Sequence, residues 1–255
     1  MSGSVHEAAA EGFGAAAGEY ERRRPLYPEA AVERLVAELE IGPGLRILDL
    51  GAGTGKLTRM LLPFGPHLIG VEPVASMREK FVEVLPDVPL AAGLAEALPL
   101  ADGSFDAVIC AQAFHWFDGD RALPEIHRVL RPGGRLALLW NVKDERFPWV
   151  KELGDILRPY QDAVPQESSG EWQAAFSRTN LFGPLTEARF PHSQRLDAPG
   201  LVERYASASY ISFLPEAEGR EVLERIRTLA DSHPETSGRE FDLPYATELH
   251  WTTRR

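Results

Sequence analysis

Residues 46–56 read RILDLGAGTGK, and this stretch decides the fold. The run from Arg46 to Leu50 is short, apolar and rich in branched side chains, as in a buried strand. Gly51, Gly53 and Gly55 follow at alternate positions, where glycine permits a tight turn with positive φ and lets a ligand reach the bare backbone. The stretch therefore predicts a strand that ends in a ligand-binding loop.

An acidic residue lies where a bound nucleoside would need one. Glu72 closes the next apolar run, HLIGVE, 21 positions after Gly51, which is about the spacing at which a carboxylate meets ribose hydroxyls in nucleoside-binding α/β proteins. A half-buried carboxylate is costly without partners, and two hydroxyls would supply hydrogen bonds of roughly 1.5–3 kcal/mol each. We therefore predict a nucleoside-cofactor site at the edge of a parallel sheet, with a surface-exposed glutamate as the alternative.

Two better-known glycine loops fit this stretch poorly. A phosphate-binding Walker loop requires Gly-Lys followed by Ser or Thr, whereas Gly55-Lys56 is followed by Leu57. The dinucleotide fingerprint requires its third glycine three places after the second, and Lys56 stands there instead. The loop therefore belongs to another class of nucleoside-binding protein.

The pattern that fits has two hydrophobic residues, Asp, another hydrophobic residue and Gly-x-Gly-x-Gly, and in it the chain resembles class I S-adenosylmethionine-dependent methyltransferases. Ile47 to Gly55 matches this pattern at every position. Four further segments match in the right order, so that the resemblance covers roughly residues 20 to 142: Val71-Glu72-Pro73, Ala95-Glu96-Ala97-Leu98-Pro99, Phe105-Asp106-Ala107-Val108 and Leu130-Arg131-Pro132-Gly133-Gly134. More narrowly, Tyr20 to Pro28 and the pair His115-Trp116 are similar to a small-molecule branch that includes trans-aconitate-type methyltransferases.

Length and composition are those of a globular protein. The 255 residues, 44 % of them hydrophobic, suffice for one large α/β domain or a domain with a modest appendage. Cys110 is the single cysteine, which excludes an internal disulfide and a multi-cysteine metal site, and we expect no metal. The sequence has no 18-residue apolar run, and its first residues are acidic where a signal peptide needs positive charge. We expect a soluble cytoplasmic protein that does not bind membranes.

The net charge of −11, with 27 basic against 38 acidic residues, argues against a nucleic-acid substrate, because binding to a phosphate backbone draws on clustered Lys and Arg. A local basic run, Arg22 to Arg24, remains. We expect a small-molecule acceptor as the partner and a monomer or a homodimer as the assembly.

Strand and helix signals alternate as a doubly wound α/β fold requires. Near-continuous apolar strands such as DAVICA and RLALLW indicate a sheet covered on both faces. We predict strands at 46–50, 67–72, 88–92, 105–111 and 135–140, and helices at 56–62, 76–84 and 118–130. Ser76 is expected to cap the second helix. The resemblance implies a Rossmann-like seven-stranded sheet that ends in an antiparallel hairpin.

Three regions are expected along the chain: an N-terminal arm with lid helices in 1–40, a cofactor-binding Rossmann-like core in 41–142, and a helical cap with C-terminal strands in 143–255. Amphipathic patterns in the last region predict helices at 147–160, 170–177, 201–205 and 216–231. The segments 185–190 and 245–251 are the candidates for the hairpin. The helices between them would then form a cap over the carboxyl edge of the sheet.

In open α/β sheets, ligands bind beyond the carboxyl ends of the strands where the strand order reverses. Gly51 and Gly53 should therefore face the cofactor's methionyl part, and Asp49 either bonds loop amides or reaches the cofactor's amino group through water. The resemblance to methyltransferases adds S-adenosylmethionine as the cofactor and further contacts to it. These come from Tyr20 (sulfonium), Arg24 (methionyl carboxylate), Ala52, Pro73, Met77 (adenine), Ala95, Glu96 and Gln112. Core packing is the alternative for Met77, and a solvated arm for Tyr20 and Arg24.

Methyl transfer from a sulfonium is an in-line displacement with a good leaving group, so the protein mainly aligns the reactants. His115 follows the fourth predicted strand and is the candidate general base if the accepting atom carries a proton; a structural histidine is the alternative. At the same edge, Trp116, Trp140 and Asn141 are candidates to line the acceptor pocket, with core packing or loop capping as alternatives. From the predicted cap, we consider Tyr205, Tyr210 and Arg195 as further substrate contacts.

Two other functions stay open at this point. One is a catalytically silent protein that binds S-adenosylmethionine or another nucleoside. The other, less favoured by the glycine spacing, is an NAD-dependent oxidoreductase. The accepting atom, whether oxygen, nitrogen or carbon, is also open.

Overall fold

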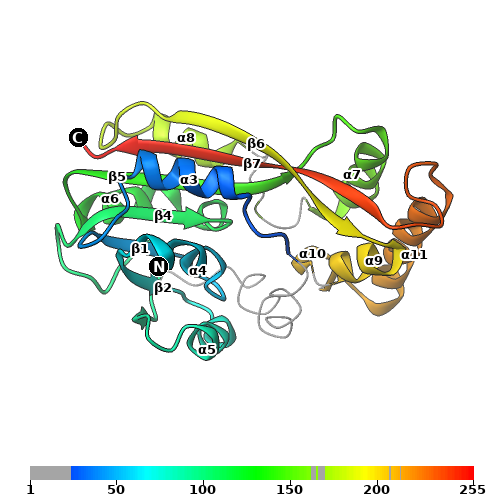
Figure 1. Ribbon diagram of the computed structural model, residues 1–255, viewed down its shortest axis with the longest axis horizontal. Helices are drawn as coiled ribbons and strands as arrows, with labels where there is room; N and C mark the ends of the chain where they lie inside the picture. Colours follow the sequence, from blue (N-terminus) through cyan, green and yellow to red (C-terminus); the bar gives the residue numbers. More distant parts are fainter. Residues whose placement is uncertain (1–23, 162–164, 166–169, 207, 213) are drawn as a thin grey trace.

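The computed structural model describes residues 24–161, 165, 170–206, 208–212 and 214–255. Within these residues, seven strands form one sheet in the order β3-β2-β1-β4-β5-β7-β6 (Figure 1). The strands are β1 (Arg46–Leu50), β2 (His67–Val71), β3 (Leu90–Ala91), β4 (Phe105–Ala111), β5 (Leu130–Lys143), β6 (Thr186–Leu196) and β7 (Phe241–Thr253). The predicted α/β class and the terminal antiparallel hairpin are confirmed.

The sheet changes direction along its width. Strands β3, β2, β1, β4 and β5 are parallel, whereas β7 is antiparallel to both β5 and β6. Because β1 pairs with β2 on one side and β4 on the other, the chain order reverses at β1. Ligands bind at such a reversal in open α/β sheets.

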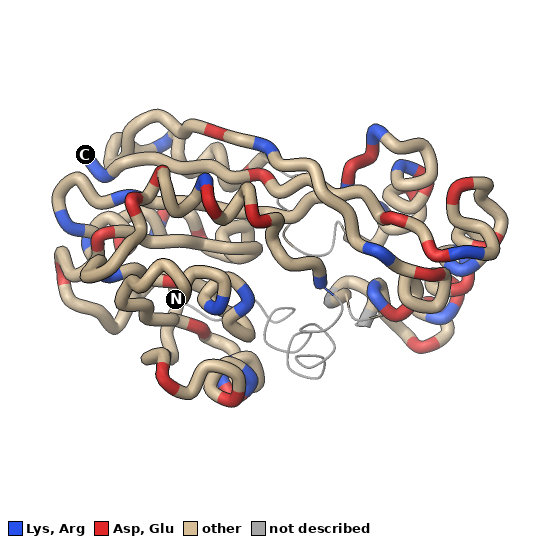
Figure 2. The backbone as a smooth tube through the Cα atoms, viewed as in Figure 1, with Lys and Arg blue, Asp and Glu red and all other residues tan. Residues whose placement is uncertain are grey.

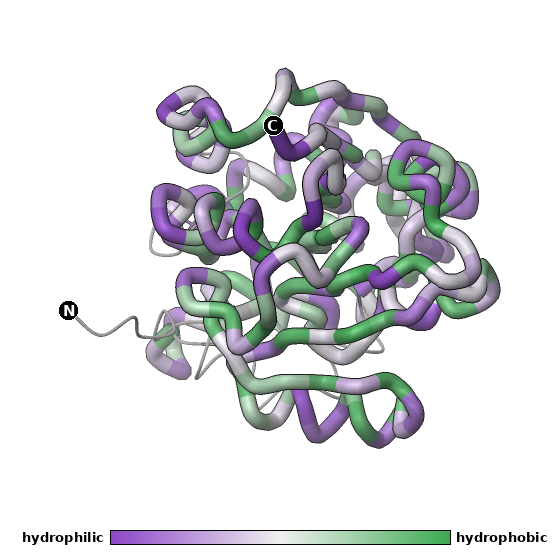
Figure 3. The backbone as a smooth tube through the Cα atoms, turned by 90° about the vertical axis from the view of Figure 1, so that its left-hand side faces the viewer, coloured by the Kyte–Doolittle hydropathy of each residue, from purple (hydrophilic) through white to green (hydrophobic). Residues whose placement is uncertain are grey.

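Helices cover both faces of the sheet because its strands carry apolar residues on both sides. In β4, Ala107 and Ile109 pack on one face with α3 (Glu29–Glu38) and α4 (Lys56–Leu61), while Val108 and Cys110 pack on the other with α6 (Gly119–Val129) and α8 (Glu171–Ser177). Figure 3 shows hydrophobic stretches in the interior of the molecule and, at its periphery, coils that alternate between hydrophilic and hydrophobic residues. Helix α3, within the segment expected to form an arm or lid, thus packs on the sheet.

The cap is a second hydrophobic cluster at the far end of β6 and β7 (Figure 1, right). It is built from α7 (Pro148–Gln161), α9 (Ala198–Ala206), α10 (Ser209–Ser212) and α11 (Glu216–Ser232). Trp149, Tyr205 and Tyr245 are at most 2 % exposed and fill its centre. The hairpin strands run without a break from the core into this cluster, with pairs from Thr186↔Trp251 to Leu196↔Phe241. The predicted cap is therefore present: α9, α10 and α11 lie between the last two strands of the chain, and α7 joins them from the segment between β5 and β6.

Element boundaries differ from the predictions where packing extends or shortens a strand. Strands β6 and β7 are longer than predicted because they continue toward the cap. Strand β5 is longer at both ends, since Leu130 pairs with Phe105 and Lys143 pairs with Tyr245, and β3 has two residues. Helices α4 and α5 (Ala75–Val84) lie as expected, α4 being followed by a 3-10 turn, η1 (Leu62–Phe64).

The predicted cap of α5 by Ser76 is wrong. The N-cap is Val74, with no side-chain cap hydrogen bond, and Ser76 lies inside the first turn. The carboxylate of Glu72 instead accepts a hydrogen bond from the Val74 N–H at 2.9 Å. An acidic group two residues earlier therefore satisfies a donor at this helix start, where negative charge is favoured.

Charge is distributed over both the core and the cap. Figure 2 shows Lys and Arg interspersed among Asp and Glu along the backbone rather than gathered in one stripe. Among the described residues, no helix is both long enough and apolar enough to cross a bilayer.

Candidate functional site

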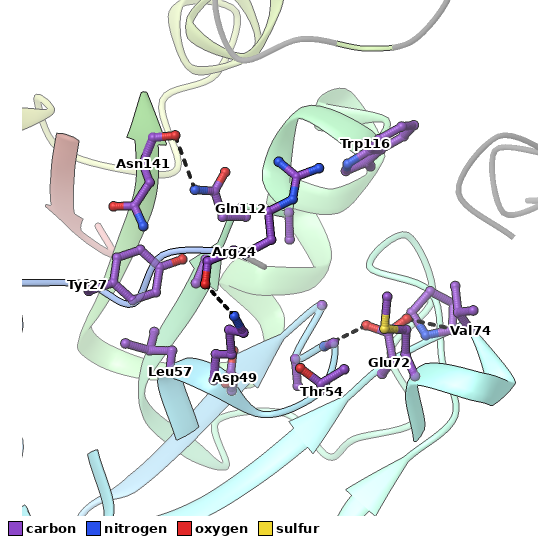
Figure 4. Close-up of a pocket in the computed structure, with 18 of the residues that line it drawn as sticks. Arg24, Tyr27, Asp49, Thr54, Leu57, Glu72, Val74, Gln112, Trp116 and Asn141 are labelled. Carbon is purple, nitrogen blue, oxygen red and sulfur yellow. Dashed lines mark hydrogen bonds between the residues drawn. The ribbon is translucent and has the colours of Figure 1, made fainter. Parts of the chain in front are cut away.

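A cavity lies where the parallel strands end and the cap begins (Figure 4). On the core side it is lined by the loop after β1, the end of β2 with the start of α5, and the ends of β4 and β5. Arg24, Pro25 and Tyr27 line it from the N-terminal segment, and Arg204 lines it from α9 in the cap. The cavity therefore lies between the core and the cap, at the position where the strand order reverses.

The glycine loop is held by the strand beside it. The amides of Gly51 and Ala52 both donate to the Val71 carbonyl, at 2.8 and 3.1 Å. Gly53 has φ +56°, and a Cβ added there would meet no atom within 4 Å. Gly51 differs, since its Cβ would lie 2.6 Å from the Cβ of Ala113. Gly53 thus leaves open space at the cavity, whereas Gly51 is required by the close packing of the segment after β4.

Glu72 lines the cavity as a buried carboxylate. Its side chain is 6 % exposed, and its two oxygens accept hydrogen bonds from the Gly53 and Val74 amides, each at 2.9 Å (Figure 4). Burial raises the pKa of Glu72, and these two amides and the Arg78 charge oppose that rise. A carboxylate has about four lone-pair sites, so two accepted bonds leave capacity for two more. The predicted exposed alternative does not apply.

Asp49 is more deeply buried, at 1 % exposure. Its Oδ2 accepts a hydrogen bond from the Thr58 hydroxyl at 2.5 Å, while Oδ1 is buried with no hydrogen-bond partner. Burial raises the pKa of Asp49 from 3.8 to about 6, against the effect of the Thr58 bonds. A buried acceptor with no partner beside a cavity is costly, and it fits a ligand or water that donates a hydrogen bond.

Gln112 is strained at the end of β4. It has φ +56°, a value that non-glycine residues rarely adopt. The backbone N–H of Gln112 donates a hydrogen bond to the Leu139 carbonyl at 2.8 Å, and this bond holds the residue in place. Such strain persists where the surroundings over-determine the backbone and it clusters at functional sites. Gln112 lines the cavity as predicted.

His115 lies in the 3-10 turn η2 (Phe114–Trp116). It is not part of the cavity lining, but its ring lies beside that of Trp116, which lines the cavity, with 5.4 Å between the ring centroids. The indole N–H of Trp140 donates to His115 Nδ1 at 3.0 Å. Burial, and to a smaller extent the positive charge of Arg24, lower the pKa of His115 from 6.5 to about 3. A neutral ring whose Nδ1 lone pair is engaged carries its proton on Nε2. This contact favours a hydrogen-bond donor over the general base that the sequence suggested.

Asn141, at the end of β5, holds the N-terminal segment against the cavity. Its amide nitrogen donates to the Pro25 and Leu26 carbonyls, each at 3.3 Å. Its side-chain oxygen accepts a hydrogen bond from the Thr247 hydroxyl at 2.6 Å and lies 3.2 Å from His192 Nε2. Asn141 therefore lines the cavity while its amide is committed to protein partners.

The cavity brings together most of the predicted residues. Its lining includes Arg24, Asp49, Gly51, Ala52, Gly53, Glu72, Pro73, Met77, Gln112, Trp116 and Asn141. Tyr20 lies outside the described residues.

Four predicted residues are not part of this lining: Ala95, Glu96, His115 and Trp140. Ala95 is buried in the hydrophobic core, and the Glu96 carboxylate accepts a hydrogen bond from the Asp118 amide at 2.8 Å. Trp140 is 1 % exposed and packs on Trp172 at 4.7 Å between ring centroids. Trp140 thus bonds His115 and lies outside the cavity lining.

The cap residue that reaches the cavity is Arg204, which the sequence reasoning missed. The predicted Arg195 is 59 % exposed and pairs with Asp242 and Glu240. Arg204 lies within the amphipathic helix α9, where an arginine is expected to face solvent. Its neighbour Tyr205, the contact considered from the sequence, is instead buried in the centre of the cap. Only the packing of α9 on the cap reveals that Arg204 turns inward.

The lining suits a nucleoside with an amino-acid tail. The backbone at Gly53 leaves open space for a ligand. Glu72 has remaining capacity to accept hydrogen bonds, and Asp49 has a buried oxygen with no hydrogen-bond partner. Arg24 adds a cation on the same cavity. The set of groups thus matches sugar hydroxyls, an amino group and a carboxylate.

Known proteins with similar sequences point the same way. Residues 48–138 match the family profile described as a methyltransferase domain. An uncharacterized methyltransferase of Mycobacterium tuberculosis is 40 % identical over 239 residues, 92 % of each chain. An uncharacterized methyltransferase-like protein of Schizosaccharomyces pombe is 37 % identical over 217 residues, 85 % of this chain and 84 % of that one. The crystal structure of the YcgJ protein from Bacillus subtilis shares the fold, with a TM-score of 0.62 at 23 % identity over 89 % of this chain and 99 % of that one.

Proposed function

The chain belongs to the class I S-adenosylmethionine-dependent methyltransferase family, and on this premise we propose that it transfers a methyl group from S-adenosylmethionine to a small-molecule acceptor. The observation that carries the proposal is Glu72, a buried carboxylate at the end of β2 that also holds the glycine loop through the Gly53 amide. When bound, the cofactor supplies a sulfonium methyl group with a good neutral leaving group.

The residues of this chain bind and orient. Glu72 accepts hydrogen bonds from the two ribose hydroxyls, and the backbone at Gly53 contacts the methionyl part. Arg24 pairs with the methionyl carboxylate, since a guanidinium matches a carboxylate with two parallel donors. Met77, which lines the cavity and is 3 % exposed, covers the adenine.

The acceptor enters from the side of the cap. Trp116, which lines the cavity from η2, forms a wall for it. His115 is not part of the lining but lies beside Trp116. It donates a hydrogen bond to the methyl acceptor through Nε2, because Trp140 engages Nδ1. Alignment of this kind contributes on the order of 7–11 kcal/mol to barrier lowering when reacting atoms are held near attack distance. A small acceptor is supported by the net charge of −11 and by the interspersed positions of acidic and basic residues along the backbone (Figure 2).

Titration calorimetry with S-adenosylmethionine, S-adenosylhomocysteine and NAD tests the proposal. We expect both sulfur nucleosides to bind and NAD not to bind. Tighter binding of NAD would instead support an oxidoreductase. Transfer of a labelled methyl group into a fractionated metabolite extract then separates an enzyme from a silent binder, since a silent binder would label nothing.

A further inference from the structure

The N-terminal segment, residues 24–28, reads RPLYP and lies along the cavity. Arg24, Pro25 and Tyr27 of this segment belong to the cavity lining. Proline fixes φ and has no N–H, and the residue before a proline favours an extended backbone. Arg24 and Tyr27 each precede a proline, so the segment is stiff, and residues 24–26 belong to no helix or strand. Their carbonyls therefore need hydrogen-bond donors from elsewhere.

Side chains from two sides of the cavity supply these donors. The Lys56 ammonium group donates to the Arg24 carbonyl at 2.7 Å (Figure 4). The Asn141 side chain donates to the Pro25 and Leu26 carbonyls, each at 3.3 Å. Lys56 follows the glycine loop after β1, whereas Asn141 lies near the end of β5. Since β4 pairs with β1 on one side and with β5 on the other, the segment crosses the carboxyl end of β4.

The length of the segment fits this crossing. Neighbouring strands lie about 4.8 Å apart, so about 10 Å separates β1 from β5. The Arg24 and Leu26 carbonyls are two residues apart, which is about 7 Å in an extended chain, and the long Lys56 side chain covers the remainder. Lys56 and Asn141 thus hold the two ends of a short, stiff bridge across the cavity.

Lys56 contributes little to its own helix. It is the first residue of α4, with Gly55 as the N-cap. The start of a helix favours negative charge and disfavours positive charge, so the position is unfavourable for an ammonium group. The bond to the Arg24 carbonyl, in contrast, is charge-assisted, and such bonds are roughly twice as strong as those between neutral groups. Lys56 therefore stabilises the N-terminal segment more than it stabilises the helix.

From these contacts, and resting on the proposed function, we infer that Lys56 is a positioning residue for methyl transfer. Its bond to the Arg24 carbonyl docks the N-terminal segment, and the docked segment brings the Arg24 and Tyr27 side chains to the cavity. Lys56 strengthens cofactor binding through the segment that it holds and not through contact with the cofactor. Loss of its bond frees one end of the segment, while Asn141 still holds the other.

Spin labelling of the ligand-free protein tests the docking. Cys110 is the single cysteine of the chain and is buried, so a nitroxide attaches selectively at Leu26→Cys, where the native side chain is 53 % exposed. In this background, Lys56→Met should raise the mobile fraction of the label several-fold, and Lys56→Arg, which keeps a donor, should restore the original spectrum. Lys80→Met, which removes a lysine that pairs with Glu83 on α5, is the matched control. An unchanged spectrum in Lys56→Met would overturn the inference.

Calorimetry tests the consequence for binding. We expect Lys56→Met to bind S-adenosylhomocysteine about tenfold more weakly than the unmodified protein, because one charge-assisted bond of the docked segment is lost. Lys56→Arg should stay within about threefold of the unmodified protein, and Lys80→Met should match it. Weaker binding in Lys56→Met with an unchanged label spectrum would show direct contact with the cofactor, contrary to the inference. Unchanged binding would contradict it as well.

A double-mutant cycle separates positioning from direct contact. If Lys56 acts by placing the segment, its removal matters less once the Arg24 side chain is gone. We therefore expect Lys56→Met to weaken binding by at most about threefold in an Arg24→Met background. A second full tenfold loss there would contradict the inference. Urea unfolding of each variant reports that it is folded.

The two levels of the argument fail in different ways. Absence of S-adenosylhomocysteine binding by the unmodified protein would contradict the proposed function. The label spectrum of the ligand-free protein still tests whether Lys56 docks the N-terminal segment.

Discussion

The core lines the cavity with a glycine loop and with many side chains from several strand ends, whereas among the described residues the cap lines it with the single side chain of Arg204. In the core, the Gly53 amide donates to the Glu72 carboxylate and the Gly51 and Ala52 amides donate to the Val71 carbonyl, so the site depends on strand ends that the sheet register fixes. In the cap, Arg204 extends from a helix whose position depends on packing around Trp149 and Tyr245. The comparison teaches that the cavity lining on the core side is tied to the fold, while the lining on the cap side can change with a single side chain.

The sharpest way to break the core side is Glu72→Ala. The change removes two charge-assisted hydrogen bonds to ribose, so we expect affinity for S-adenosylmethionine to fall by about 3 kcal/mol or more, roughly a hundredfold. Calorimetry measures it. Glu79→Ala, which changes an exposed glutamate of α5, is the matched control. Cofactor affinity that survives in Glu72→Ala would remove the basis of the proposed function.

Asp49→Asn tests by how much the burial of an ionised carboxylate lowers the stability of the folded protein. The pKa of Asp49 is raised from 3.8 to about 6, so the folded protein loses stability as pH rises from about 4 through 6, where the unfolded chain is ionised and the folded one resists ionisation. We expect the Asp49→Asn variant without ligand to be more stable than the unmodified protein at pH 8, by about 2–3 kcal/mol, and equal to it near pH 3.5, where both side chains are neutral.

Urea unfolding across this pH range measures the difference, and Asp87→Asn, at an exposed position, is the control. A constant stability difference at all pH values would show that Asp49 does not titrate in this range.

His115→Asn examines the histidine at the boundary of the two sides. Its pKa is lowered from 6.5 to about 3, so its contribution to stability is present above pH 6.5 and is lost as pH falls toward 3, because only the unfolded chain then takes up the proton. Between pH 6.5 and 5, the unmodified protein should lose about 2 kcal/mol relative to His115→Asn. Parallel unfolding curves for the two proteins would mean that the ring is protonated normally when folded.

Asn141→Ala sharpens the comparison at the N-terminal segment, which belongs to neither side. Loss of the bonds to the Pro25 and Leu26 carbonyls should cost about 1 kcal/mol and speed hydrogen exchange at the Leu26 and Tyr27 amides. Exchange followed by mass spectrometry measures it, with the exposed Asn180→Ala as control. Unchanged exchange in this segment would show that other contacts hold it.

The smallest effect is expected for Arg195→Ala in the cap. Arg195 is 59 % exposed and its ion pair with Asp242 is at the surface, so stability should change by less than about 0.5 kcal/mol. Thermal unfolding and methyl-transfer assays measure it. A large loss of activity would mean that the outer face of the hairpin contributes to the site.

The core was largely predictable from the sequence, and the cap was not. Glycines at alternate positions and an acid at the end of the next apolar run are local signals, and strand ends of a parallel sheet must meet at one edge. The roles of Gly51 and Asn141 were less predictable, because they depend on Ala113 and on the N-terminal segment, which are distant in sequence. Arg204 lies in an ordinary amphipathic pattern, and only tertiary packing turns it inward.

The continuous hairpin has a consequence for how such a protein can be altered. Leu196 and Phe241 are paired at the last rung of β6 and β7, so the chain leaves and returns at points about 5 Å apart. A segment whose ends are this close can be exchanged for one of another length without changing the strand register. Replacing the segment between these two positions with a foreign helical segment should therefore change which methyl acceptor is bound, while the part of the core that lines the cavity keeps its structure.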